Sequence, residues 1–230
     1  MCNQLRVEFF KFCRFGLFYF GLFFMAGMGL YLGYLKMPSE NIYVGFAAAL
    51  GDTSMVFMPT LVSAWFVGND FSNRTIHNEI TIGCKRLFVL LVRELPTFLS
   101  TVILHFVLVV SVVIGMGIKS GFSFEVFQMQ DLGWCVTVML QLIAMQSIIV
   151  LITFVCGKAA SSIAVSVCFI LFVCNILRNF LETKVYSMSC FCLAQNNSYE
   201  TLIPTGIAAI VTTVAVVILT WLVFRKKEIK

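Results

Sequence analysis

The chain has 230 residues, of which 60% are hydrophobic and only 12% are charged, and its net charge is +5. An ordinary soluble domain carries about 25% charged residues, so a water-soluble core cannot hide this much apolar surface. The composition therefore excludes a soluble globular protein and predicts a chain that resides in a lipid bilayer.

The 14 residues ahead of the first apolar run have an amphipathic pattern with a helical period. One face carries apolar residues: Leu5, Phe9, Phe12 and Cys13. The other face carries polar and charged residues: Gln4, Glu8, Lys11 and Arg14. This pattern predicts a short helix that lies in the membrane interface, with its basic residues near anionic headgroups.

A transmembrane helix needs roughly 20 apolar residues, because it rises about 1.5 Å per residue through about 30 Å of hydrocarbon. Six stretches have this length, which predicts an all-α membrane protein with a single domain of six transmembrane helices. The predicted spans cover residues 15–35, 42–68, 95–118, 132–156, 159–177 and 202–224. The first span is too long for the apolar core of a cleavable signal peptide, so we expect it to be retained.

Basic residues predict the orientation, since loops rich in Lys and Arg stay in the cytoplasm. With a cytoplasmic N-terminus, the inner side holds twelve of them: Arg6, Lys11, Arg14, Arg74, Lys85, Arg86, Arg93, Lys158, Arg225, Lys226, Lys227 and Lys230. The outer side then holds four: Lys36, Lys119, Arg178 and Lys184. This bias predicts a multi-pass protein of the cell (plasma) membrane with both termini in the cytoplasm.

Two loops between the predicted spans are long, residues 69–94 on the inner side and residues 178–201 on the outer side. The outer one contains Cys190 and Cys192. A disulfide across one intervening residue is strained, so we expect free thiols there.

The inner loop has helix signals at both ends. Asn69 or Asp70 can cap a helix at its start, and Gly83 can stop one. Ile76 and Ile80 lie about one helical turn apart. The loop is therefore expected to contain a short amphipathic helix that lies parallel to the membrane.

This loop resembles the corresponding loop of the permease subunits of bacterial ABC-2 type exporters. In that family an acidic residue after the second span is followed by an Asn-Gly-Thr-like step, then by Gly and a basic residue. The matching residues here are Asp70, Asn73, Thr75, Ile76, Gly83 and Arg86, with Arg93 where the family often has Lys. Arg74 stands where the family has Gly, so an ordinary residue has to make a turn that Gly favours.

The resemblance also covers the six-span plan, and it implies that the inner loop is a coupling helix that docks on a separate ATP-binding cassette subunit. The candidate coupling residues are Asp70, Phe71, Asn73, Arg74, Thr75, Ile76, Glu79, Gly83 and Arg86. It further implies a second permease subunit, as a homodimer or heterodimer, and an outer segment that dips back into the outer leaflet. The alternative interpretation is a solvated loop whose charges only set the topology.

The sequence shows no convincing nucleotide-binding motif. A phosphate-binding loop ends in Gly-Lys-Ser or Gly-Lys-Thr after a strand. The nearest stretch, GMGIKS from Gly115 to Ser120, has Ile118 between Gly and Lys and lies at the outer end of an apolar span. We therefore expect no catalytic or metal site, no cofactor and no nucleic-acid partner for this chain, with ATP and Mg²⁺ bound by the partner subunit.

Two ionisable residues lie inside predicted spans, Asp52 in the second and His105 in the third. A carboxylate at the bilayer centre costs about 2.5–3.5 kcal/mol on insertion scales, so neither side chain is expected to face lipid. One interpretation makes them part of a substrate path or a proton-sensitive pair. The other is an interhelical hydrogen bond with no further role.

The leading functional hypothesis is the permease subunit of an ATP-driven exporter that moves an amphipathic cargo, such as an antimicrobial peptide, a drug or a lipid-like molecule. Self-protection against a peptide antibiotic follows only by family analogy. A gradient-driven secondary transporter or channel is the alternative, although no internal repeat is evident. An intramembrane hydrolase that uses His105 with Asp52 or Glu94 is less well supported, because no nucleophile or metal motif accompanies them.

Overall fold

The computed structural model describes residues 2–36, 42–122, 128–173, 176, 191, 193–194 and 199–227. Within these ranges the chain forms helices joined by turns, with no β-strand. The α-helices are α1 (Cys2–Cys13), α2 (Gly16–Tyr31), α3 (Ile42–Leu50), α4 (Phe57–Ser72), α5 (Thr75–Thr81), α6 (Arg86–Ser120), α7 (Met129–Cys156), α8 (Ala159–Cys168) and α11 (Tyr199–Lys226). A π-helical turn extends α2 over Leu32–Lys36 and another extends α8 over Phe169–Val173.

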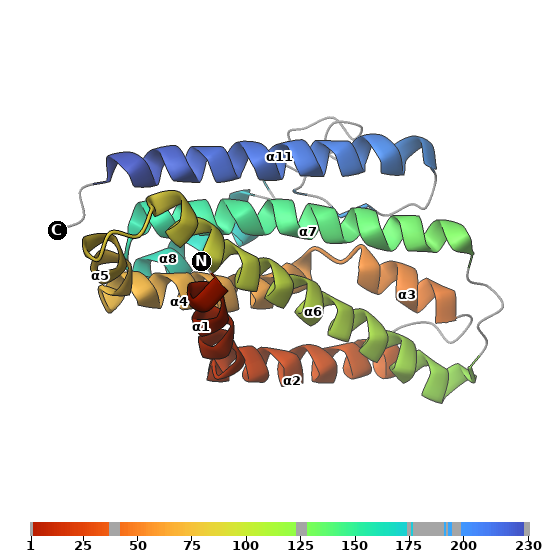
Figure 1. Cartoon of the computed structure of the whole chain (residues 1–230). Helices are drawn as coiled ribbons and strands as arrows, with labels where there is room; N and C mark the ends of the chain where they lie inside the picture. Colours follow the sequence, from red (N-terminus) through yellow and green to blue (C-terminus); the bar gives the residue numbers. More distant parts are fainter. Residues whose placement is uncertain are drawn as a thin grey trace.

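Long helices run side by side through the molecule, and the short α1 and α5 lie towards one end (Figure 1). We call this the α5 end of the bundle. Four helices are long and apolar enough to cross a membrane: Gly16–Leu35, Arg86–Ser120, Met129–Cys156 and Glu200–Lys226. Ala159–Phe172 is a shorter apolar helix. The predicted all-helical class is confirmed, and these helices are compatible with a multi-pass membrane protein. The count of six spans stays a prediction.

The second predicted span is not one continuous helix. It divides into α3 and α4, with residues 51–53 outside any helix and a 3₁₀ turn over Ser54–Val56. Gly51, Asp52 and Thr53 all have low helix propensity, and Asp and Thr side chains compete for backbone hydrogen bonds. These three residues therefore interrupt the helix within the predicted span.

Small residues let α2 and α6 approach until their backbones touch. A Cβ atom on Gly29 would lie 2.6 Å from the Cβ of Ser111, and one on Gly115 would lie 2.9 Å from the carbonyl oxygen of Leu30. Close approach of small residues is a common way to associate helices in lipid, where the hydrophobic effect between helices is weak. Gly29 in the first predicted span therefore serves packing within this chain.

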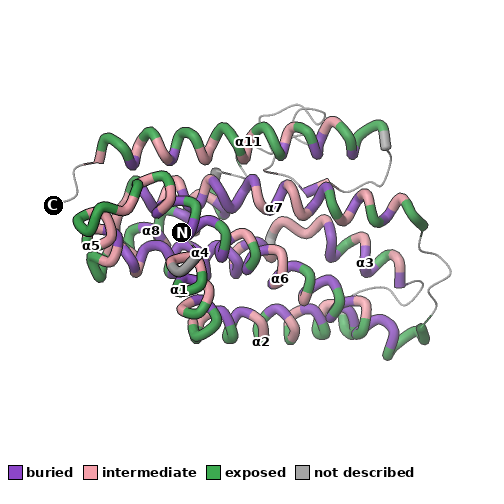
Figure 2. The backbone as a smooth tube through the Cα atoms, viewed as in Figure 1, coloured by how far each residue is buried: buried purple, intermediate pink, exposed green. Residues whose placement is uncertain are grey.

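Burial is concentrated on α6 and α7, whereas α2 and α11 are exposed along much of their length (Figure 2). On α11 the exposed side chains are large and apolar: Ile203, Ile207, Val211, Val214, Ile218 and Leu222. Such a surface needs lipid or another apolar partner to cover it.

Part of the outer segment packs against α7. The indole Nε1 of Trp134 donates to the carbonyl oxygen of Ala194 at 2.6 Å, and the backbone N–H of Ala194 donates to Oε1 of Gln141 at 2.8 Å. Gln141 lies about 18 Å along α7 from Met129, given 1.5 Å per residue. Leu193 is fully buried, so this part of the segment enters the bundle. Cys190 and Cys192 lie outside the described residues.

Candidate functional site

The turn between α4 and α5 depends on an unusual backbone conformation. Arg74 has φ 57° and ψ 17°, and among the described residues it alone has a positive φ without being glycine. The left-handed region costs an L-residue with a side chain roughly 1–2 kcal/mol. The chain therefore bends sharply at the position where the resembling family has glycine.

Replacing Arg74 with Gly tests this strain. We expect Arg74→Gly to raise the free energy of unfolding by about 1 kcal/mol. Glycine adopts a positive φ without a steric cost, and this gain exceeds the loss that comes from the larger conformational entropy of glycine in the unfolded chain. Thermal unfolding in nanodiscs measures the change. Asn73→Gly is the matched control, since Asn73 has φ −87° and its replacement is expected to give no gain.

An ion cluster of five side chains lies beneath this turn: Glu8, Lys11, Asp70, Glu79 and Arg93. Arg93, from α6, is its centre, and its side chain is only 1% exposed. Its Nε donates to Oδ2 of Asp70 at 2.9 Å, which ties α6 to α4. Its Nη1 and Nη2 donate to the two oxygens of Glu79 at 2.9 and 3.0 Å, which ties α6 to α5. This bidentate geometry is the strongest pairing available to an arginine and a carboxylate.

Helix α1 supplies the other two members of the ion cluster. The ammonium group of Lys11 pairs with Asp70 and lies 3.5 Å from Oε2 of Glu8, and Oε1 of Glu8 lies 3.9 Å from Nη2 of Arg93. The polar face of α1 thus turns into the protein, while Val7 and Phe10 are exposed. The expected arrangement, with the charged face towards the headgroups, is incomplete, because Glu8 and Lys11 serve the buried cluster.

Three carboxylates and two cations meet in the ion cluster, so it carries one excess negative charge when every group is ionised. Burial raises the pKa of Glu8 above its ordinary value, and the attraction of Arg93 only partly offsets this. Protonation of Glu8 would leave the cluster neutral, which is the inexpensive state for a buried site.

The raised pKa of Glu8 predicts a pH dependence of stability. The folded state binds this proton more tightly than the unfolded state does, so the favourable contribution is complete below about pH 4.5 and is lost as the pH rises through the folded-state pKa. We expect Glu8→Gln to flatten the fall in melting temperature above pH 4.5. Glu200→Gln, at an exposed carboxylate of α11, is the control and should leave the fall unchanged.

A second set of contacts closes the ends of α7 and α11. Nη1 of Arg86 donates to the carbonyl oxygens of Phe224 at 2.8 Å and Arg225 at 2.6 Å. Nζ of Lys227 donates to the carbonyl oxygen of Phe154 at 2.7 Å. Cations at a helix C-terminus satisfy its last carbonyls and oppose the negative end of its dipole. Phe154 also packs edge-on against Phe224, with ring centroids 5.0 Å apart.

The predicted coupling residues divide into buried and exposed groups. Asp70 and Ile76 are buried, Glu79 is held by Arg93, and Phe71 and Arg86 are half-buried in contacts within the chain. The exposed members are Asn73, Arg74 and Gly83. Thr75 is half-buried at the start of α5. Asp70 and Glu79 thus fix α5 in place, and their carboxylates are engaged within the chain.

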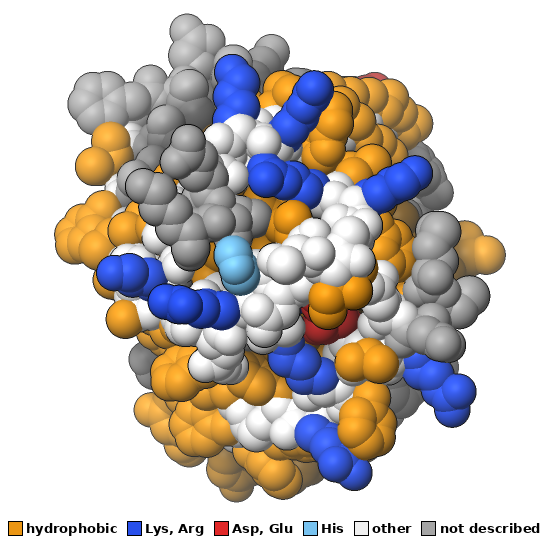
Figure 3. All heavy atoms as spheres, turned by 60° about the vertical axis from the view of Figure 1, so that its left-hand side comes forward, with side chains coloured by type: hydrophobic (Ala, Val, Ile, Leu, Met, Phe, Trp, Pro, Cys, Tyr) orange, Lys and Arg blue, Asp and Glu red, His pale blue; other side chains and the backbone are white. Residues whose placement is uncertain are grey.

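The exposed surface of the α5 end is basic. Figure 3 shows Lys and Arg side chains spread over this face. The exposed cations of this end are Arg6, Arg14, Arg74, Lys85, Lys158, Arg225 and Lys226. Its described carboxylates lie inside, apart from the partly exposed Glu79 of the ion cluster. One large apolar side chain, Ile82, projects from the tip of α5 and is 83% exposed. Such a surface suits a negatively charged partner.

Sequence reasoning did not find Glu8, Lys11 and Arg93 as a unit. The available signal was the charged face of the N-terminal helix, together with an arginine just before the third predicted span. That signal does not show which partners the side chains choose, because residues 8 and 93 come together only in the fold.

His105 and Asp52, the predicted intramembrane pair, both lie at the break between α3 and α4. His105 is fully buried, and its Nε2 lies 3.3 Å from the carbonyl oxygen of Leu50, the last residue of α3. Asp52 lies within the break and is half-buried. This contact joins α6 to the end of α3, and the two interpretations of the pair stay predictions.

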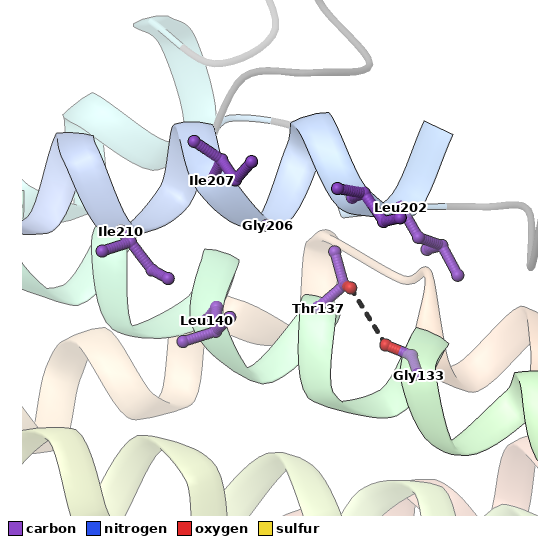
Figure 4. Close-up of a pocket in the computed structure, with 8 residues that line it drawn as sticks. Gly133, Thr137, Leu140, Leu202, Gly206, Ile207 and Ile210 are labelled. Atoms are coloured by element: carbon purple, nitrogen blue, oxygen red, sulfur yellow. Dashed lines mark hydrogen bonds between the residues drawn. The ribbon is translucent and has the colours of Figure 1, made fainter. Parts of the chain in front are cut away.

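An apolar groove of about 290 Å³ lies between α7 and α11 (Figure 4). The hydroxyl of Thr137 donates to the carbonyl oxygen of Gly133 at 2.9 Å, so this polar group is satisfied within α7. Leu140, Ile207 and Ile210 contribute apolar side chains to the lining. The groove offers no charged or catalytic group, and among the described residues no cluster of His, Cys, Asp and Glu could hold a metal ion.

Comparison with known proteins assigns no family. No family model matches the sequence, and no curated protein matches it significantly.

Proposed function

We propose that this chain is the membrane-spanning permease subunit of an ABC-2 type exporter, driven by a separate ATP-binding subunit. The observation that carries the proposal is that the ion cluster holds α5 in a fixed position against the rest of the bundle. This short helix projects at one end of a membrane bundle, and the ion cluster joins it to α1, α4 and α6. A force applied to its exposed tip would reach three other helices through paired charges.

The proposed topology has six spans, with both termini in the cytoplasm. In it, α3 and α4 together make the second crossing, and α8 with its π-helical extension makes the fifth. The basic α5 end then faces the cytoplasm, in keeping with the positive-inside rule. A fluorescent protein fused to the C-terminus, together with protease access to the α5 tip in inverted membrane vesicles, tests this orientation. Protection of the tip in such vesicles would contradict it.

In the proposed complex the permease works as a homodimer or heterodimer, and ATP and Mg²⁺ bind to the partner. The cargo is amphipathic: an antimicrobial peptide, a drug or a lipid-like molecule. The apolar lining of the α7–α11 groove and the small number of charged groups along the spans favour such a cargo over a strongly charged one.

The test of coupling uses the exposed tip of α5, because the buried carboxylates of the ion cluster would damage folding. Ile82→Asp combined with Lys85→Glu is expected to weaken co-purification with a co-expressed ATP-binding cassette subunit by about tenfold or more. Lys158→Glu, an exposed cation of the same end, is the matched control and should retain binding. Full retention by the tip variant, with normal folding, would contradict docking at α5.

A second candidate, a gradient-driven transporter, is favoured by one observation. The helix break at Asp52 is typical of transporters whose ion sites lie at interrupted helices near the middle of the bilayer. Purified protein in liposomes separates the two proposals. Transport driven by a pH gradient without ATP supports this candidate, whereas transport that needs the ATP-binding subunit and ATP supports the exporter.

A further inference from the structure

The joint between α3 and α4, residues 51–53, is held from the side by a histidine. Nε2 of His105 lies 3.3 Å from the carbonyl oxygen of Leu50. A carbonyl can only accept a hydrogen bond, so Nε2 carries the hydrogen. In the neutral ring Nδ1 is then a bare acceptor.

That acceptor is buried and unsatisfied. His105 is fully buried, and Nδ1 has no hydrogen-bond partner among the described residues. Buried ring nitrogens are normally paired, and an unpaired one needs a reason. A proton is the smallest ligand that Nδ1 can accept, and it turns the ring into a cation.

Asp52, inside the joint, is an acidic group that can attract this cation. The stretches of α2, α3, α4 and α7 within the bilayer, residues 17–31, 42–50, 57–69 and 132–156, contain no Asp, Glu, Lys, Arg or second His. Burial disfavours a charge on the His105 ring, and the hydrogen bond to Leu50 and the attraction of Asp52 partly offset this cost. Attraction between an imidazolium and a carboxylate is strong in such an apolar setting.

We propose that Nδ1 of His105 is a proton-binding site whose occupancy sets the conformation of the joint between α3 and α4. The proton comes from water and remains on Nδ1, so the ring gains one positive charge and no other bond changes. The imidazolium attracts the Asp52 carboxylate and strengthens the hydrogen bond to Leu50, and both effects tighten residues 51–53. Loss of the proton loosens the joint. The site is independent of the proposed ATP-binding partner.

The chain offers a clean spectroscopic test because it has only two histidines. In a His77→Gln background, protein with ¹⁵N-labelled imidazole in nanodiscs gives signals from His105 alone. We expect Nδ1 to pass from the acceptor to the protonated chemical shift as the pH falls through a window of about 7 to 3. Hydrogen-exchange protection of amides 51–53, corrected for intrinsic rates, should change about tenfold with the same midpoint.

Two variants complete the test. In Asp52→Asn the ring should still titrate, while protection of the joint no longer follows it. His105→Gln keeps a donor for the Leu50 carbonyl but cannot take up the proton, so its joint should be insensitive to pH. The proposal is overturned if His105 keeps one neutral form throughout the window, if it titrates without any change in the joint, or if the His105→Gln joint still responds to pH.

Discussion

Arg93→Met is expected to lower the free energy of unfolding by about 3–5 kcal/mol, the largest effect of any single substitution in the ion cluster. Methionine retains most of the side-chain volume but removes the cation. Glu79 would then lose both of its charge-assisted hydrogen bonds to Arg93, and the buried Asp70 would keep only its pair with Lys11. Thermal and denaturant unfolding in nanodiscs measure the loss, and limited proteolysis near α5 should show that this helix detaches.

Replacing the carboxylates of Asp70 and Glu79 with amides, together with Arg93→Met, is the control for this effect. We expect the triple variant Arg93→Met, Asp70→Asn, Glu79→Gln to recover most of the lost stability, because neutral amides are far cheaper to bury than unpaired carboxylates. Arg93→Lys should be intermediate, since an ammonium group cannot make the bidentate pair. A cost below about 1 kcal/mol for Arg93→Met would show that the cluster is solvated and weak.

Gly29→Val is expected to disrupt the packing of α2 on α6, at a cost of about 3 kcal/mol or more. The first carbon of any side chain at this position would lie 2.6 Å from the Cβ of Ser111 and 2.7 Å from the carbonyl oxygen of Leu108. Backbone atoms cannot rotate away, so the two helices would have to separate. The melting temperature and the yield of monodisperse protein should both fall.

Gly27 provides a matched control on the same helix. It is exposed, and a Cβ atom there meets nothing within 4 Å. Gly27→Val should therefore change stability by no more than about 0.5 kcal/mol. Equal losses for the two variants would mean that glycine serves backbone conformation in α2, and would contradict a close approach to α6.

The candidate site could be located from the sequence, but its internal arrangement could not. Helix signals and the family resemblance both pointed to the stretch that holds α5, and Arg74 does make the sharp turn there. The predicted roles of its two carboxylates differ from those in the structure. Asp70 and Glu79 were candidates for contact with a partner, yet both bind Arg93 of the same chain. A charged residue in a sequence does not reveal whether water, a partner or a distant side chain satisfies it.

Composition and the length of the apolar runs determined the membrane class and the helical architecture. Side chains that face hydrocarbon must be apolar, and a helix forms all its backbone hydrogen bonds internally where no water is present. Tertiary structure alone decided two further points. It placed Glu8 and Lys11 in the ion cluster around Arg93, and it brought His105 to the carbonyl of Leu50. Both depend on contacts between residues far apart in the chain, which local periodicity does not encode.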